Sequence, residues 1–449
     1  MLPAFGVLKE TLKSVIYNKE EQGYKTDELY DELKALPDSF DAIYDFALKL
    51  SRLEIRGDWP YVEPSKFDDI LKECATDRPL GLIKEIPLEE SSRRVETAFL
   101  SSVCACILGK PFEEFPLPTL YEIKEALIKT NEWPLKDYVT EETLSALGRR
   151  NSSWIETTRG RIAHVASDDD ITYSICGMLL LEKYGINFTK DNIRQLWIEN
   201  LPIYTVWGPE RNILLKAGIA SLVPDEPIDY DEWTNILNPG EELCGALIRA
   251  DAYGYACPGR PDLASKLAWQ DASFTHKKTG IYGAMFIAAV ISIAQVIDDR
   301  MGIFEMALKF IPQRSRFHEI VQDSLDEVRQ AKDFEDGYSR IHEKYKEYGA
   351  CRVYQETGTL INTLKFAENI PDGFCKQVMQ GNDTDSFGAT SGSILGAYFG
   401  PDYFDEKWLK PFNDDIYTTM SSFKERKLSN VAKRMSKLPY IVSEELEKK

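Results

Sequence analysis

The stretch that decides the fold is "GNDTDSFGATSGSILGAYFG", residues 381–400, in which an acidic loop runs directly into a helix of small residues. The small side chains stand at Gly388, Ala389, Gly392, Gly396 and Ala397. Because these residues project little beyond the backbone, a second helix can approach this one closely. We therefore expect the helix to lie in the interior and to carry the loop of Asp383, Asp385 and Ser386 there with it.

A second acidic loop precedes another apolar helix in "HVASDDDITYSICGMLLLEKYG", residues 164–185. Ser167 is followed by Asp168, Asp169 and Asp170. A carboxylate at a helix N-terminus can cap free N–H groups and is favoured by the helix dipole, by about 1 kcal/mol for each well-placed group. This explains one or two aspartates, but three carboxylates at the mouth of a buried helix need a further source of stabilisation.

A pair of divalent cations is one such source. Mg²⁺ prefers carboxylate, hydroxyl and water oxygens, and each acidic loop offers at least two carboxylates and a serine hydroxyl. The chain has only four histidines, so a zinc site built on histidine is disfavoured. Two plainer interpretations stay open: a pair of helix N-caps, or a calcium site that only stabilises the fold.

Composition bounds the function. The 449-residue chain has 54 Lys and Arg against 73 Asp and Glu, a formal charge of −19, and 43% hydrophobic residues. This charge disfavours nucleic acids and anionic membranes as partners, because both attract basic surfaces. It does not argue against a small anionic ligand, which needs only a local site.

The cysteines and the apolar segments favour a cytoplasmic protein. Eight cysteines are scattered along the chain without a C-x-x-C pair, which is typical of buried, reduced thiols. The first residues lack the uninterrupted apolar run of a secretory signal. The longest apolar run, residues 281–297, lies at the lower limit for spanning a bilayer, and we expect a buried core helix there.

Helical periodicity dominates the chain, and alternating strand patterns are scarce. We expect helices at residues 26–36, 39–53, 95–109, 171–184, 190–199, 209–221, 241–252, 261–273, 281–296, 316–333, 336–347, 358–368 and 386–399. The predicted fold is all-α, compact and multi-helical. The predicted division is a smaller helical N-terminal region (1–90), a catalytic domain (91–415) and a charged helical C-terminal tail (416–449).

At the two acidic loops the chain resembles the ADP-ribosylglycohydrolase family, which includes the enzyme that removes ADP-ribose from dinitrogenase reductase. The family has an early [ST]-D-D-T motif and a late G-D-T-D-[ST] motif, matched here by residues 167–170 and 382–386. Three further stretches are similar to the family pattern: "ILGKPFEEF" (107–115), the segment from "CGALIR" to "DASFTH" (244–276), and "TGIYGAMFIAAVISIA" (279–294). The N-terminal helices, with "DWPYVEPS" (58–65), resemble a longer bacterial branch of this family.

The resemblance implies an all-α fold with a two-ion Mg²⁺ or Mn²⁺ centre, and it implies roles for particular residues. The implied metal ligands are Ser167, Asp168, Asp169, Asp383, Asp385 and Ser386. The implied catalytic carboxyls are Glu113, as acid or base, together with Asp168 and Asp169. The implied substrate-binding residues are Gly245, Arg249, Asp251, His276, Tyr282 and Asn382.

Several of these residues also have a structural interpretation. His276 could contact phosphate or ribose, or could be a cap or a hydrogen-bonded structural group. Arg249, beside Asp251, could hold a pyrophosphate or form a buried ion pair. Tyr282 could stack on adenine or simply pack in the core.

Three departures from the family pattern leave the substrate open. Asp170 stands where many members have threonine, "SSVCACILG" (101–109) lacks the acid usual before Glu113, and "CGALIR" lacks the asparagine that usually precedes the glycine. The expected reaction is hydrolysis of a ribosyl glycosidic bond, with an ADP-ribosylated protein or a small ADP-ribose adduct as substrate. The alternatives are an N-glycosidase acting on a nucleoside-like molecule, and a non-catalytic, ADP-ribose-binding or structural member of the family.

Overall fold

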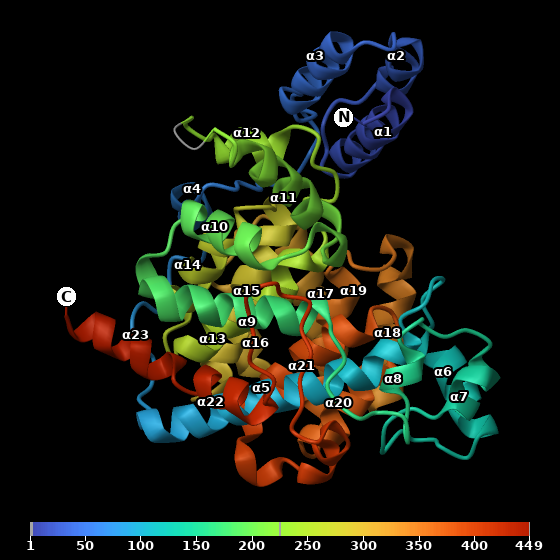
Figure 1. Cartoon of the computed structure of the whole chain (residues 1–449), viewed down its shortest axis with the longest axis vertical. Helices are drawn as coiled ribbons and strands as arrows, with labels where there is room; N and C mark the ends of the chain where they lie inside the picture. The colour runs from blue at the N-terminus through green and yellow to red at the C-terminus, as the bar shows by residue number, and fades with distance from the viewer. Residues whose placement is uncertain (1–2, 224–225, 449) are drawn as a thin grey trace.

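The protein is built from helices. A computed structural model describes residues 3–223 and 226–448 and contains 23 α-helices in that part of the chain. Strand pairing among these residues is limited to isolated bridges such as that between Val165 and Ile416. The all-α fold expected from the helical periodicity is therefore confirmed (Figure 1).

The first half of the chain holds the helices α1 (Phe5–Glu21), α2 (Leu29–Ala35), α3 (Phe40–Ser51), α4 (Phe67–Glu73), α5 (Leu88–Gly109), α6 (Leu120–Lys129), α7 (Glu141–Leu147), α8 (Trp154–Thr157), α9 (Asp169–Tyr184), α10 (Lys190–Asn200), α11 (Gly208–Ala220) and α12 (Tyr230–Asn235). The second half holds α13 (Asp251–Ala256), α14 (Pro261–Ala272), α15 (Lys278–Ala294), α16 (Arg300–Leu308), α17 (Arg316–Gln330), α18 (Phe334–Tyr345), α19 (Tyr354–Phe366), α20 (Ile370–Met379), α21 (Thr384–Phe399), α22 (Leu428–Met435) and α23 (Leu438–Glu447).

The closest helix pair in the core is α5 against α21. A Cβ atom added to Gly392 would lie 2.4 Å from the backbone oxygen of Ser101, and one added to Gly396 would lie 2.3 Å from Cα of Ala98. The hydroxyl of Ser101 donates a hydrogen bond to the backbone oxygen of Gly392 at 2.7 Å. The two backbones are thus in contact, as the small residues of the 381–400 stretch predict.

The apolar segment at 281–297 is a core helix, as expected. Every residue of α15 is buried. The segment with the most spanning-helix character is instead Leu88–Phe112, which comprises α5 and the short 3-10 helix η1 (Lys110–Phe112). Among the described residues it is the one helix long and apolar enough to cross a membrane, and 83% of its apolar window is buried inside the structure.

The helix expected at 241–252 differs from the structure. Residues Cys244–Arg249 form the 3-10 helix η4, and α13 begins only at Asp251. Glu241 and Glu242 stay outside any helix because their carboxylates are engaged elsewhere. Glu241 accepts a hydrogen bond from Gln22 at 3.0 Å, and Glu242 accepts one from Arg316 at 2.6 Å. Tertiary contacts have overridden the local periodicity here.

The N-terminal helices α1, α2 and α3 form a small lobe at one end of the molecule (Figure 1). They share a separate apolar cluster that includes Leu12, Ile43 and Leu50. The connector that follows is fixed to the main body: the Tyr282 hydroxyl donates to the Pro64 oxygen at 2.5 Å, and the Trp269 indole donates to the Ser65 oxygen at 2.9 Å.

The C-terminal segment also packs on the main body. Helix α22 contacts α5, and α23 contacts α5, α9 and α13. The carboxylate of Glu445 accepts a hydrogen bond from the backbone N–H of Ile186 at 2.8 Å, just beyond the end of α9.

The close approach of α5 and α21 generates a prediction for stability. Gly392→Ala forces a methyl group against the backbone of Ser101, and we expect it to lower the free energy of unfolding by roughly 1–3 kcal/mol. The matched control is Gly218→Ala in α11, where an added Cβ meets no atom within 4 Å. That change should be neutral or stabilising by up to ~1 kcal/mol, because alanine is the better helix former. Urea unfolding measures both, and equal midpoints for the two variants would contradict the backbone contact.

Candidate metal centre

The two acidic loops meet at the end of α5. Asp168 is the N-cap of α9, and its Oδ1 accepts a hydrogen bond from the backbone N–H of Asp170 at 2.9 Å. Asp383 is the N-cap of α21. The hydroxyl of Thr384 donates to the backbone oxygen of Gly109 at 2.8 Å, which ties the second loop to the last residue of α5.

Lys110 joins the two loops. Its Nζ contacts Oδ2 of Asp168 and lies 3.2 Å from Oδ2 of Asp385, and all three side chains are nearly buried. This ammonium group reduces the repulsion between the carboxylates, because it places a positive charge between two loops that are more than 200 residues apart in sequence. Lys110 was not among the residues predicted from the sequence, although it stands between Gly109 and Pro111 in the 107–115 stretch.

Glu113 completes the carboxylate group on one side. One carboxylate oxygen each from Glu113, Asp383 and Asp385 lie within 4.8 Å of one another. The side-chain amide of Asn151 donates to the backbone oxygen of Glu113 at 2.7 Å and to its Oε2 at 3.3 Å. Glu113 is therefore held at the cluster by the loop that precedes α8.

Two thiols lie on the other side of Asp383. Its Oδ2 is 3.2 Å from Sγ of Cys351 and 3.6 Å from Sγ of Cys244. Glu356 stands behind them and accepts hydrogen bonds from the backbone N–H of Cys351 at 2.8 Å and from the side chain of Asn382 at 3.0 Å. Cys244 occupies the position of the asparagine that "CGALIR" lacks, which was the one signal in the sequence that could have placed it here.

Asp170 points into the protein. It is 2% exposed, and its Oδ2 accepts a hydrogen bond from the hydroxyl of Ser386 at 3.3 Å. Ligand atoms of Cys106, Asp168 and Asp170 lie within 4.8 Å of one another. The unusual third aspartate therefore adds a carboxyl to the same cluster instead of extending into solvent.

Burial and mutual repulsion separate the pKa values of these acids. Burial, followed by the charges of Asp385 and Asp383, raises the pKa of Glu113 to about 11. Burial raises the pKa of Asp169 to about 8 and that of Asp383 to about 7, with Asp168 and Asp385 as the neighbouring charges. Burial would also raise the pKa of Asp168, but the Lys110 ammonium reverses the shift and holds it below its usual range.

The donor set fits divalent cations. Oδ1 of Asp170 and Oδ1 of Asp383 are buried and have no hydrogen-bond partner among the described residues. An unpaired buried carboxylate oxygen is costly, and a hard cation is the partner that such oxygens coordinate. Ser167 lies half-buried directly before Asp168, and Ser386 is buried beside Asp385, so all six predicted ligands belong to the two loops that meet here.

A sequence comparison identifies the family at this point. The ADP-ribosylglycohydrolase family profile matches residues 88–438. The chain belongs to the ADP-ribosylglycohydrolase family. The match begins at the first residue of α5 and contains every predicted site residue, whereas α1 to α4 lie outside it.

No curated protein matches the chain. A solved structure described as an "ADP-ribosylglycohydrolase-related protein complex" is similar, with a TM-score of 0.46 and 16% sequence identity over 78% of this chain and 99% of that chain.

Arg249 lies in a buried ion cluster. It is 2% exposed, and its guanidinium contacts the carboxylates of Glu210 and Asp271. It also donates to the hydroxyl of Thr275 at 2.6 Å and to the backbone oxygen of Gly245 at 2.8 Å. With its N–H groups engaged in this way, the geometry favours the buried ion pair over the pyrophosphate contact, the two interpretations that the sequence left open.

Two other predicted substrate-binding residues are also enclosed in the core. Nδ1 of His276 lies 2.7 Å from the Thr275 hydroxyl and 3.5 Å from Glu210, and burial followed by the Arg249 charge lowers the pKa of this histidine. Asp251 accepts a hydrogen bond from Ser393 at 2.5 Å, and burial raises its pKa to about 7. Ser393 is seven residues beyond Ser386 on α21, roughly 10 Å along the helix, so Asp251 binds α21 about two turns away from the carboxylate cluster.

The other three predicted residues differ in their surroundings. Gly245 faces Glu210, whose Oε1 would lie 2.5 Å from an added Cβ. Tyr282 packs in the core with its hydroxyl bound to the connector at Pro64. Asn382 is the one of the six that lies at the cluster, directly before Asp383 and bonded to Glu356.

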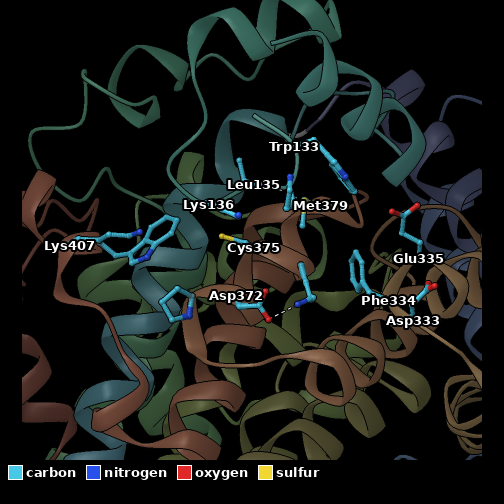
Figure 2. A pocket seen from close by; sticks show the side chains of 14 residues that line it. Trp133, Leu135, Lys136, Asp333, Phe334, Glu335, Asp372, Cys375, Met379 and Lys407 are labelled. Carbon is cyan, nitrogen blue, oxygen red and sulfur yellow. Dashed lines mark hydrogen bonds and ion pairs between the residues drawn. The ribbon is translucent and has the colours of Figure 1, made fainter. Parts of the chain in front are cut away.

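A cavity of about 690 Å³ lies elsewhere, beside α20 (Figure 2). Asp372, Cys375 and Met379 of α20 line it, and none of the predicted site residues does. Lys407 lies at the opposite end of this cavity from Asp333 and Glu335 (Figure 2). The charges of the cavity lining are balanced, and the cavity is separate from the candidate metal centre.

The bridging ammonium generates a prediction for the metal-free protein. Lys110→Met leaves Asp168 and Asp385 without their positive partner, and we expect a loss of about 3–5 kcal/mol of stability in the presence of a chelator. Added Mg²⁺ should restore part of that loss. The control is Lys124→Met, whose partner Glu335 is 45% exposed and whose loss should cost under about 1 kcal/mol. Equal chelator-treated unfolding midpoints for the two variants would contradict the bridging role.

The ion cluster at Arg249 generates a second prediction. Arg249→Met leaves Glu210 and Asp271 buried without a counter-charge, so we expect about 3–5 kcal/mol of destabilisation whether or not Mg²⁺ is present. Thermal unfolding with and without Mg²⁺ measures this. A variant of unchanged stability that binds ADP-ribose less tightly would instead support a phosphate contact.

Proposed function

We propose that the protein is a metal-dependent glycohydrolase that cleaves the ribosyl glycosidic bond of an ADP-ribosylated substrate and releases ADP-ribose. The observation that carries this proposal is the meeting of the two acidic loops around Lys110, with buried carboxylate oxygens of Asp170 and Asp383 left unpartnered. Membership in the ADP-ribosylglycohydrolase family supports the glycosidic bond as the point of attack. The substrate is either a modified protein or a small ADP-ribose adduct.

The residues that would hold two Mg²⁺ or Mn²⁺ ions are Ser167, Asp168, Asp169, Asp383, Asp385 and Ser386. When bound, such ions supply Lewis-acid chemistry and positive charge next to the ribose hydroxyls. The surrounding side chains are buried, with Asp383 and Asp385 only 4% and 3% exposed. Bulk water is therefore largely excluded from these carboxylates, which strengthens every electrostatic interaction among them.

Glu113 is the proposed general acid. Burial and the charges of Asp385 and Asp383 raise the pKa of Glu113 to about 11, whereas the Lys110 ammonium lowers the pKa of Asp168. Paired carboxyls whose pKa values are pushed apart in this way are typical of glycosidases, in which one acid protonates the leaving group. Asn151 holds the backbone and one side-chain oxygen of Glu113 and so fixes the position from which the proton is given.

The same carboxylate cluster bears on the two alternatives, a non-catalytic family member and a nucleoside-directed N-glycosidase. A non-catalytic member would have no need to keep buried carboxyl oxygens of Asp170 and Asp383 without a partner among the described residues, because each costs stability. Cys244, which contacts Asp383, replaces the asparagine of the family pattern and so leaves the substrate open, and a nucleoside-directed N-glycosidase stays the alternative. A panel of substrates therefore includes nucleosides.

The experiment combines metal binding with product release. In Asp383→Asn and Asp168→Asn, we expect calorimetric Mg²⁺ affinity to fall by at least about tenfold, because a charged oxygen ligand is lost. Release of free ADP-ribose from ADP-ribosyl-arginine or ADP-ribosyl-serine should fall with it. The control is Asp402→Asn, a carboxylate whose side chain is 87% exposed.

Three outcomes separate the candidate functions. Wild-type Mg²⁺ binding and turnover in both variants would end the metal assignment. Cleavage of nucleosides but not of ADP-ribose adducts would select the N-glycosidase. Binding of ADP-ribose without cleavage of any member of the panel would select the non-catalytic alternative.

A further inference from the structure

A cavity of about 510 Å³ lies between the N-terminal segment and the part of the chain that matches the family profile. Three residues that precede the family match, Glu21, Trp59 and Tyr61, supply one wall. We call this space the junction cavity. Its other walls come from residues between 242 and 354.

The inner wall of the junction cavity adjoins the candidate metal centre. Arg352 of this wall directly follows Cys351, whose thiol lies 3.2 Å from Asp383. Glu242 stands two residues before Cys244, the other thiol at Asp383.

The same wall continues into α19. Tyr354 of the cavity stands two residues before Glu356, which binds the side chain of Asn382. The wall is also turned sharply, because Cys351 and Val353 have φ values of +61° and +62° on either side of Arg352. Such values are unfavourable for a β-branched residue and cluster at functional sites.

Aromatic side chains dominate the cavity. Its lining includes Trp59, Tyr61, Tyr345, Tyr348 and Tyr354. Trp59 and Tyr61 meet edge to face with centroids 5.3 Å apart, and Tyr348 and Tyr354 do so at 4.8 Å. The Tyr348 side chain is 44% exposed, so ring surface is available to a ligand. Aromatic faces stack on flat π-systems and attract cations.

The charges of the cavity lining disfavour an anionic ligand. The cavity has four carboxylates, those of Glu21, Glu242, Glu319 and Asp323, against the two guanidiniums of Arg316 and Arg352.

Both guanidiniums are already paired. Arg352 binds Glu21 at 2.7 Å, and Arg316 binds Glu63 at 2.9 Å and Glu242 at 2.6 Å. Asp323 is paired with Lys344 at 2.8 Å. Glu319 is therefore the one lining carboxylate without an ion pair among the described residues, and its negative charge disfavours phosphate groups.

The outer wall is a fixed part of the fold. Glu63 is held by Arg316, and the backbone N–H of Val62 donates to the oxygen of Arg314 at 2.9 Å. Together with the bonds of Pro64 and Ser65 to Tyr282 and Trp269, these contacts hold Trp59 and Tyr61 in place before any ligand arrives.

We propose that the junction cavity is a substrate subsite for a flat group without negative charge, a nucleobase or a guanidinium, and that the N-terminal segment exists to complete it. The word "substrate" rests on the proposed function. The binding of a flat, nitrogen-rich group in the junction cavity is independent of the proposed function, because it follows from the aromatic walls and their charge.

Calorimetry tests the subsite without requiring hydrolysis. The full-length protein is titrated with adenosine, with methylguanidine and with inorganic phosphate. The variants are Tyr348→Ala, which removes an exposed ring, and Tyr61→Ala, which removes a ring of the N-terminal wall. The matched controls are Tyr61→Phe, which keeps the ring and loses only the bond to Glu319, and Tyr403→Ala, an exposed tyrosine outside the cavity lining.

We expect one of the two flat probes to bind, and each alanine variant at the cavity to weaken it by at least about fivefold. Tyr61→Phe and Tyr403→Ala should change binding by less than about twofold. Adenosine binding assigns the subsite to a nucleobase, and methylguanidine binding assigns it to a guanidinium. The proposal is overturned if neither probe binds at millimolar concentration, if the cavity variants bind like the controls, or if phosphate binds and is lost in the same variants.

The Asp383→Asn variant separates this proposal from the proposed function. It should lose Mg²⁺ binding and hydrolysis while keeping probe binding within about twofold of wild type, because it leaves the aromatic walls intact. A wild-type protein that hydrolyses no ADP-ribose adduct but binds a flat probe through Tyr61 and Tyr348 would end the proposed function and leave the subsite standing.

Discussion

The contact between the backbones of α5 and α21 is the constraint on which the rest of the structure depends. Without side chains between them, the two helices bring Gly109 against Thr384. Lys110 and Glu113, which follow Gly109, then necessarily lie beside Asp383 and Asp385. A bulkier helix at 384–399 would separate the end of α5 from the acidic loop, and the carboxylates would have no common neighbour.

Electrostatics then determines how those carboxylates behave. One ammonium and three thiols, those of Cys106, Cys244 and Cys351, are too little to satisfy a cluster that contains Glu113, three consecutive aspartates and the Asp383–Asp385 loop. Burial and mutual repulsion therefore raise the pKa of Glu113, and two buried oxygens, those of Asp170 and Asp383, have no hydrogen-bond partner among the described residues. Natural proteins tolerate such arrangements chiefly where function requires them.

Local patterns predicted many of the longer helices, the interior position of α21 and the approach of its acidic loop to the other one, but not α1, α6, α16 or α20. They did not predict Lys110, Cys351 or Glu356 at the centre, because these contacts join segments far apart in sequence and no short pattern encodes them. The helix expected at 241–252 was wrong for the same reason: Glu241 and Glu242 are held by Gln22 and Arg316 from distant segments. Residue roles taken from the family resemblance remain predictions, and Arg249 shows that matching a motif does not place a side chain at a ligand.

The position of Lys110 has a consequence for the proposed binding of divalent ions. Its ammonium is tethered to the chain and already sits between Asp168 and Asp385, so a divalent ion that uses both carboxylates must displace a resident counter-ion. Uptake is then an exchange of cations, and the apparent affinity is weaker than the number of carboxylates alone would give. In return, Lys110 holds the two acidic loops together without any divalent ion.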